Sequence, residues 1–192
     1  MWRYAGHTTD GEWLVYDKDG DIIRASQAGD EDREVVGNGM PKFTLSSTHS
    51  FRYRDFDLTL FLRGAFFYDI FNIHDFYYGT RNFTGNRLQK AYGKNFDIAP
   101  TANPVVCDYF LERGDYLKLD MVTLGYTFRP KDWRFLDRIR IYATGKNLLT
   151  LTKFSGVDPS TYQVNGLTPG AQGSRTYFPS TRQFIVGLQV DF

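Results

Sequence analysis

Three carboxylates at alternate positions near the N-terminus have the residue type and the spacing of calcium ligands. These residues are Asp17, Asp19 and Asp21. An EF-hand loop also needs a glycine at its sixth position and a glutamate at its twelfth, whereas Gly20 comes too early here and Ala28 occupies the twelfth position. A hairpin that pairs residues 13–16 with residues 22–23 and turns at Gly20 accounts for the segment better. The three aspartates are therefore weak metal candidates.

The other side chains with catalytic potential stand alone in the sequence. They are three aspartates in predicted strands, Asp57, Asp120 and Asp191, three histidines, His7, His49 and His74, and the cysteine Cys107. Glycoside hydrolysis requires two carboxyl groups about 5–9.5 Å apart, and no spacing pairs any two of these aspartates. The histidines lack a second ligand four residues away, and the cysteine lacks a nearby histidine that would activate it. We expect no enzyme activity, no metal and no cofactor.

The composition excludes several classes of protein. Hydrophobic residues make up 42% of the 192 residues and charged residues 23%, which fits neither a disordered nor a collagen-like chain. A formal charge of +1 gives no argument for binding nucleic acid. One cysteine excludes an intrachain disulfide, and no apolar run reaches the roughly 18 residues of a transmembrane helix. The 17 Phe, 13 Tyr and 18 Gly favour β-structure.

Alternation of apolar and polar residues predicts the strands that hold these side chains. The five predicted strands cover residues 42–53, 56–68, 115–128, 138–149 and 182–192. The alternation is clearest in the last strand, where the apolar positions are Phe184, Val186, Leu188, Val190 and Phe192. Within 115–128 the apolar positions change phase, which indicates a β-bulge or a strand that passes between two environments.

Short and long connections alternate between the predicted strands. Residues 54–55 and 129–137 form short turns, whereas 69–114 and 150–181 are long polar loops, and 1–41 is a loop region with a small hairpin. Soluble domains rarely contain such long loops. Transmembrane β-barrels combine short periplasmic turns with long extracellular loops.

The length of the strands agrees with a membrane-spanning sheet. Eleven residues at about 3.3 Å each, tilted by about 40°, span roughly 27 Å, the height of an outer-membrane barrel. We therefore expect an all-β fold, a fragment of an antiparallel transmembrane β-barrel with its long loops outside the cell. The alternative is a soluble carbohydrate-binding β-sandwich. The first residues lack the basic and apolar stretches of a signal peptide, so we expect a cytoplasmic protein or a piece of a longer chain.

Several short motifs resemble SusC/RagA-type TonB-dependent outer-membrane transporters. The segment ERGDYLKL at 112–119, followed by VTLGYT at 122–127, resembles the family's "DGSYLRLKNVTLGYT" strand. The other matches are NLLT at 147–150 with "QNLLT", SGVDP at 155–159 with "SGVDPE", YFPSTR at 177–182 with "YPxPRT", LQVDF at 188–192 with "GLNLTF", GMPKF at 39–43 with "xxPKF" and YRDFDL at 53–58 with "YKxFDL". Their order and approximate spacing extend over about residues 35–192.

This resemblance implies a 22-stranded, plugged barrel in the cell outer membrane, driven by TonB, that imports oligosaccharides or peptides delivered by a SusD-like lipoprotein lid. The chain would hold the last five strands. Five strands leave two open edges and close no pore, so we expect it to be inactive alone. The implied partners are the remaining N-terminal barrel and plug, the SusD-like lipoprotein, the TonB complex through the missing N-terminal part, the barrel-assembly machinery and outer-membrane lipid.

The resemblance also suggests roles for three groups of residues. The apolar positions of the last strand, ending at Phe192, would form the signal that the barrel-assembly machinery recognises. Aromatic residues after the second strand would either form a girdle at the membrane boundary or contact ligand or lid; these are Phe76, Tyr77 and Tyr78. Polar residues on the lumen side would contact substrate, the plug or only water; these are Arg63, Arg140, Lys146 and Gln189.

Overall fold

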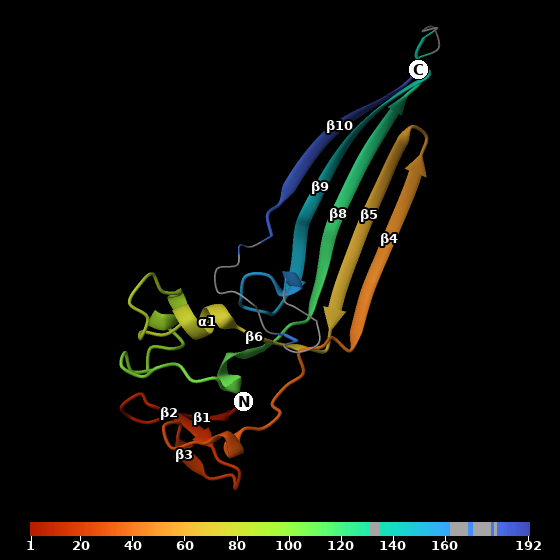
Figure 1. The fold of residues 1–192 in the computed structure, drawn as a ribbon. Coiled ribbons are helices and arrows are strands. Elements are labelled where there is room, and N and C mark those ends of the chain that lie inside the picture. The colour runs from red at the N-terminus through yellow and green to blue at the C-terminus, as the bar shows by residue number, and fades with distance from the viewer. Residues whose placement is uncertain (131–134, 162–168, 171–177, 179) are drawn as a thin grey trace. The chain divides into compact units, whose positions relative to one another are not determined.

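The computed structural model divides the chain into two compact units, shown as a ribbon in Figure 1. It describes residues 1–130, 135–161, 169–170, 178 and 180–192. We call the first unit the loop unit; it comprises Met1–Pro41, Phe67–Gly114 and Phe154–Phe178. We call the second the sheet unit; it comprises Lys42–Phe66, Asp115–Lys153 and Pro179–Phe192. Each unit is described by itself.

The sheet unit is one antiparallel sheet. Its strands lie side by side in the order in which they occur in the sequence. The strand order is β10-β9-β8-β5-β4. The strands are β4 (Phe43–Tyr53), β5 (Phe56–Phe66), β8 (Tyr116–Phe128), β9 (Arg138–Thr152) and β10 (Gln183–Asp191). The predicted all-β, antiparallel fold is confirmed.

Two of these strands differ in length from the prediction. Strand β5 ends at Phe66, two residues before the predicted end, because Phe67 adopts a φ of 63° that no strand residue can hold. Strand β9 continues to Thr152, three residues past the predicted end, because Leu149 and Leu151 pair with leucines of β8. The other three strands agree with the predicted ranges to within one residue at each end.

A β-bulge explains the change of phase in the strand predicted at 115–128. Leu119 pairs with Leu149, whereas Met121 pairs with Lys146, so the register shifts at Asp120. The pairing of β8 with β5 shifts at the same place. On the opposite strand Asn147 has a φ of 54°, a left-handed conformation that asparagine tolerates better than most residues. The bulge keeps the leucines on both sides of Asp120 on one face of the sheet.

The register divides the sheet into two chemically distinct faces. We call the first the apolar face; its exposed large side chains are Phe51, Tyr53, Phe56, Leu124, Tyr126, Phe128, Ile141, Leu149, Leu151, Phe184, Val186 and Leu188. We call the second the polar face; it carries Ser50, Arg52, Asp57, Thr59, Arg63, Thr123, Arg140, Thr144, Lys146 and Gln189, together with four large side chains, Phe61, Met121, Tyr142 and Ile185. Exposed apolar surface of this extent marks a face that meets a partner or a membrane.

The loop unit begins with a three-stranded sheet. Its strands are β1 (Arg3–His7), β2 (Trp13–Tyr16) and β3 (Ile22–Arg24). Strands β2 and β3 form a hairpin over the segment where the sequence predicts one. Strand β1 lies in a region that the sequence analysis treats as irregular, because a register shift between Tyr4 and Gly6 interrupts its alternation.

The segment predicted as the long loop 69–114 also contains regular structure. Strand β6 (Asp69–Phe71) pairs with β7 (Leu111–Arg113), and between them lies the helix α1 (Ile73–Tyr78). Where the structure describes the loop unit, it also has four 3-10 helices: η1 (Asp30–Asp32), η2 (Gln89–Tyr92), η3 (Asp108–Phe110) and η4 (Pro159–Thr161). Within the described residues, no helix has the length and apolar character needed to cross a membrane.

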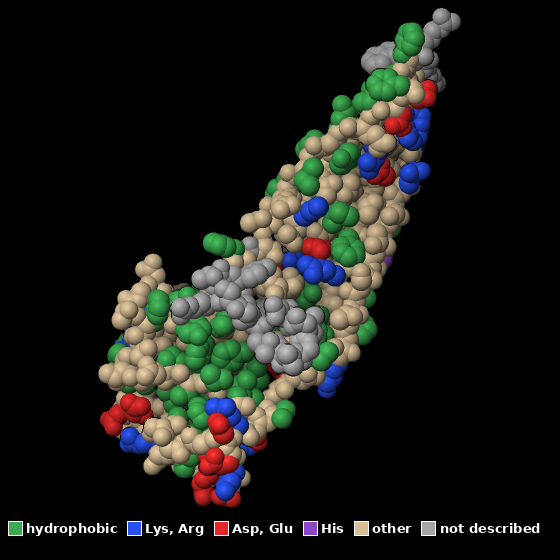
Figure 2. Space-filling view, in the orientation of Figure 1, with side chains coloured by type: hydrophobic (Ala, Val, Ile, Leu, Met, Phe, Trp, Pro, Cys, Tyr) green, Lys and Arg blue, Asp and Glu red, His purple; other side chains and the backbone are tan. Residues whose placement is uncertain are grey.

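Buried aromatic and small residues form the core of the loop unit. The fully enclosed members are Trp13, Ile98, Ala102, Cys107 and Phe110. They come from the β2 strand, from the segment after η2 and from η3, which lie far apart in the sequence. In Figure 2 hydrophobic side chains gather over this unit. The core makes the loop unit an ordered body.

Gly187 is the residue whose size matters most for the pairing of β9 with β10. It lies directly opposite Tyr142, and a Cβ at this position would overlap the tyrosine ring. The ring therefore covers the glycine, an arrangement that holds two neighbouring strands in one register.

We expect Gly187→Val to lower the free energy of unfolding by about 1–3 kcal/mol, the typical cost of overpacking a close contact. The reason is that the valine side chain displaces the ring of Tyr142. Denaturant titration of the purified protein measures the change. The same substitution in a Tyr142→Ala background is the control and should cost much less. Equal costs in the two backgrounds would refute this role of the ring.

Candidate functional site

The register brings the four predicted lumen residues onto one face. Arg140 lies opposite Gln189, and Arg63 and Lys146 belong to the same polar face. Arg63 donates from Nε to Oδ2 of Asp120 at 2.7 Å. Lys146 and Gln189 are exposed. This face therefore offers both paired and solvent-facing polar groups.

Asp57 and Arg140 form the most closely joined ion pair of the polar face. Arg140 donates from Nε to Oδ1 at 2.9 Å and from Nη2 to Oδ2 at 2.5 Å. This two-bonded geometry fixes the guanidinium in one plane. The guanidinium carbon also lies 5.0 Å from the ring centroid of Tyr142, close enough for a cation–π interaction.

A glycine on the strand between them makes this ion pair possible. Gly125 of β8 pairs with Asp57 of β5 and with Tyr142 of β9. A Cβ on Gly125 would lie 2.5 Å from Oδ1 of Asp57 and 2.6 Å from Nη2 of Arg140. The two side chains therefore meet across the backbone of β8 only because this position has no side chain.

Each of the three strand aspartates considered above as glycosidase carboxylates forms an ion pair with an arginine. Asp57 binds Arg140 and Asp120 binds Arg63, as described above. Asp191 binds Arg138. Among the described residues these carboxylates are paired with cations and not with one another. The polar face is thus organised for binding and positioning.

The polar face also contains an arginine that the sequence analysis did not single out. Arg52 of β4 lies opposite Asp57, and a hollow beside it is lined by Ser50, Phe51, Arg52, Asp57, Thr59 and Arg140. The sequence does place Arg52 among the polar positions of its strand. Its neighbours, however, become apparent only from the register. In Figure 2 basic and acidic side chains lie next to one another along the sheet.

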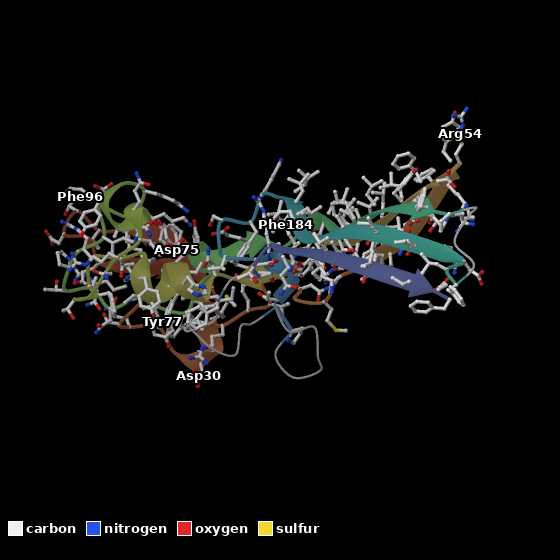
Figure 3. All side chains as sticks on the ribbon, turned by 90° about the horizontal axis from the view of Figure 1, so that it is seen from above. Asp30, Arg54, Asp75, Tyr77, Phe96 and Phe184 are labelled. Carbon is white, nitrogen blue, oxygen red and sulfur yellow. The ribbon has the colours of Figure 1, made fainter. Side chains whose placement is uncertain are left out.

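The three predicted aromatic contacts have different surroundings. All belong to α1, whose first turn is capped by the side chain of Asn72 accepting from the amide of Asp75. The ring of Phe76 packs against Phe71 and Phe110 in the core, at centroid distances of 5.4 and 5.2 Å. Tyr78 packs edge-on against Phe83 at 4.9 Å. Tyr77, labelled in Figure 3, is 37% exposed and is the most exposed of the three.

A charged network ties four segments of the loop unit together. Lys90 of η2 donates from Nζ to Oδ2 of Asp75 at 2.8 Å and to Oγ of Ser155 at 2.7 Å, and lies 3.4 Å from Oε1 of Glu112. Asn95 donates to the second oxygen of Asp75 at 3.2 Å. Asp75 is only 1% exposed, and these partners supply the hydrogen bonds that a buried carboxylate needs.

The network shifts the pKa values of two of its members. Burial alone would raise the pKa of Glu112, but hydrogen bonds from Ser155 and Asn72 and the charge of Lys90 lower it below the ordinary value. Burial alone would lower the pKa of Lys90, but its hydrogen bond to Asp75 and the two nearby carboxylates raise it. Both groups are therefore held in their charged forms.

The remaining candidates from the sequence occupy structural positions. Asp17 accepts the amides of Asp19 at 3.0 Å and Asp21 at 2.8 Å, which closes the turn between β2 and β3. Burial raises the pKa of the Cys107 thiol to about 12, so the thiol stays protonated. No three His, Cys, Asp or Glu side chains within the described ranges are grouped as metal ligands.

The histidines are similarly placed for packing and local hydrogen bonding. Burial lowers the pKa of His7 and of His74. The ring of His7 packs against Trp13 at 4.6 Å and shares a hydrogen bond with the hydroxyl of Tyr4. His49 lies 3.0 Å from Oγ of Ser47. The predicted assembly residues of β10 lie on the apolar face, and Phe192 follows the strand.

Comparison with known proteins identifies relatives that share this sequence pattern. No family model matches the chain. It is 26% identical over 204 residues to TonB-dependent receptor P3 of Formosa agariphila, an alignment that covers 98% of this chain and 20% of that protein. It is 24% identical to TonB-dependent receptor SusC of Bacteroides thetaiotaomicron, covering 76% of this chain and 14% of SusC. The chain thus spans a fifth or less of the length of these two relatives.

Solved structures share the fold over the whole chain. The RagAB peptide importer in its "closed-closed" state matches with a TM-score of 0.74 and 20% identity, over 100% of this chain and 22% of that one. The "open-open" state of the same importer matches with a TM-score of 0.75 and 21% identity, at the same coverage. This likeness confirms the predicted fold class, an antiparallel all-β sheet of the kind found in the wall of a β-barrel.

We expect acid to loosen the charged network of the loop unit. Because the folded pKa of Glu112 lies below its ordinary value of 4.5, its contribution to stability is present above that pH and is lost as the pH falls through the folded pKa. Lys90, with a pKa above 10.5, stays charged throughout this range. The amide of Ser155, which donates to Glu112 at 2.8 Å, should therefore lose hydrogen-exchange protection in acid.

Hydrogen exchange of the purified protein between pH 3 and 7, corrected for intrinsic rates, measures this loss. Glu112→Gln should weaken the protection at neutral pH and remove most of its pH dependence. Glu31→Gln changes an exposed carboxylate of η1 in the same unit and should leave the profile unaltered. An unchanged profile in Glu112→Gln would contradict the assignment.

Proposed function

Because the chain belongs to the SusC/RagA-type TonB-dependent receptors, we propose that it forms part of the wall and the external loops of an outer-membrane importer. The imported substrates are oligosaccharides or peptides. The observation that carries this proposal is the sheet with one apolar and one polar face, in a chain similar to these receptors over nearly its whole length. The chain contributes binding surface and barrel wall, and performs no chemical conversion.

The two faces of the sheet match the two environments of a barrel wall. Side chains alternate between lipid and lumen in a transmembrane barrel. The apolar face, with its exposed phenylalanines, leucines and valines, faces lipid, and the polar face lines the interior. Strands of 9 to 15 residues, tilted as in known barrels, cross a bilayer. The two-residue turn at 54–55 then lies on the periplasmic side.

The chain supplies only a part of such a barrel. In the described residues the sheet ends at β4 on one side and β10 on the other, each with one edge unpaired. An unpaired edge is not tolerated within a bilayer. The remaining strands and a plug, outside this chain, complete the wall and close the pore. The chain is therefore inactive alone.

The loop unit provides the surface for partners outside the cell. Its buried core and charged network order it, and Tyr77 of α1 is partly exposed at its surface. We assign this surface to a SusD-like lipoprotein or its ligand. Energy comes from the TonB complex, which acts through the part of the receptor outside this chain.

The alternative is a soluble carbohydrate-binding β-sandwich, and the exposed apolar face is evidence against it. A sandwich buries the inner face of each sheet beneath a second sheet. Here the large side chains of the apolar face are exposed, which would drive aggregation in water. A lipid environment removes that cost.

We expect the native protein to fractionate with the outer membrane as a large band that shifts when the sample is boiled. The shift arises because a closed barrel stays folded in detergent until it is heated. An antibody against residues 80–97 of the loop unit, applied to immunoblots of fractionated cells, detects it. A soluble band near 22 kDa, the mass of this chain alone, would contradict the proposal.

We expect Phe192→Ser in the full-length receptor to reduce the amount assembled in the outer membrane several-fold. The reason is that the substitution removes the last apolar side chain of the pattern that the assembly machinery recognises. Phe135→Ser is the matched control, since Phe135 is equally exposed, at 87% against 88% for Phe192, but lies outside the strands. Quantitative immunoblotting of the outer-membrane fraction compares the two. Equal levels would refute a special role for the terminal residue.

A further inference from the structure

Five arginines gather near the short-turn end of the sheet unit. They line one hollow together with Asp55 and Asp57; they are Arg52, Arg54, Arg129, Arg138 and Arg140. Three of them have an aspartate partner: Arg129 with Asp55, Arg138 with Asp191 and Arg140 with Asp57. In the described residues no ion pair joins Arg52 or Arg54 to a carboxylate. The end of the sheet therefore carries excess positive charge.

These two arginines differ in where they lie. Arg54 belongs to the two-residue turn and extends beyond the strand ends in Figure 3, with its guanidinium 5.4 Å from the ring of Tyr53. Arg52 lies on the polar face, where it lines the second hollow with Ser50, Thr59 and Arg140. Asp57 directly faces Arg52, but both of its oxygens accept from Arg140. The carboxylate opposite Arg52 is thus already bonded to Arg140.

The hollow has the composition of a carboxylate site. Two guanidinium groups supply donors in fixed planes, and two hydroxyls can donate beside them. The single carboxylate, Asp57, orients Arg140 and leaves a net charge of +1 on the lining. Planar guanidinium groups match the geometry of a carboxylate better than any other donor.

We infer that Arg52, Arg140, Ser50 and Thr59 bind the carboxylate of an aspartate or glutamate from the part of the same receptor that lies outside this chain. The inference rests on the proposed function, in which the polar face lines the barrel interior. Arg52 is exposed on this sheet and shares Asp57 with Arg140, so a second carboxylate would balance its charge once the barrel interior encloses it. The chain spans about a fifth of its relatives' length, so most of the receptor remains to supply the acidic group.

Zero-length crosslinking of the full-length receptor tests this inference. The variant Arg52→Lys keeps the positive charge and introduces an amine that a carbodiimide couples to a touching carboxylate. Purified receptor without substrate is treated and digested, and mass spectrometry identifies the crosslinked peptides. Arg54→Lys is the matched control, because it makes the same substitution two residues away, in the turn.

We expect the lysine introduced at position 52 to couple to one acidic residue outside this chain. The yield should be about tenfold above that of the control, because a bound carboxylate has a high effective concentration. Coupling to Asp57 alone, equal yields in both variants, or coupling only to an added acidic peptide would overturn the inference. Each variant is first checked for heat-modifiable migration from the outer membrane. Failure of wild-type receptor in that check would refute the proposed function itself, whereas failure of crosslinking alone would refute only the carboxylate site.

Discussion

The register of the antiparallel strands is the constraint on which the rest of the sheet unit depends. A shift of one residue would move every side chain of a strand to the opposite face. The bulge at Asp120 shows how closely this is controlled, since it absorbs one residue of β8 and keeps Leu117 and Leu119 on the apolar face. The displaced aspartate turns to Arg63 instead. One local irregularity thus preserves the apolar face and completes an ion pair.

The same register creates the chemistry of the polar face. Asp57, Gly125, Tyr142 and Gly187 stand in one row across β5, β8, β9 and β10. The row alternates a functional side chain with a glycine, so each side chain has room to lie over its neighbour. The ion pair of Asp57 occupies the space above one glycine, and the tyrosine ring occupies the space above the other. The ion pair and the tyrosine ring therefore lie flat against the strands and leave the interior of the proposed barrel open.

Much of the sheet could be predicted from the sequence, because apolar and polar residues alternate along strands of 9 to 15 residues. Strand ends, such as Phe66 with its left-handed neighbour, depend on single backbone angles that leave no periodic signal. The network of Asp75, Lys90 and Glu112 was not foreseen, since its members come from three short elements far apart in the chain. Arg52 was missed for a related reason. The alternation of its strand places Arg52 on the polar side, but only the pairing of β4 with β5 shows that it lies opposite Asp57.

The two units obtain their order from different sources, and this bears on how such a receptor works. The loop unit encloses its own aromatic core and a satisfied charged network, so its conformation is determined largely by its own sequence. Among the described residues, the sheet unit leaves an apolar face and two strand edges exposed, and Arg52 has no ion pair of its own. Under the proposed function, each of these three features has a different complement: lipid for the face, strands for the edges and a carboxylate for the arginine. One chain thus joins a sheet whose apolar face and edges lack cover within the described residues to loops that enclose their own core, so the stability of the sheet depends on its surroundings more than that of the loops does.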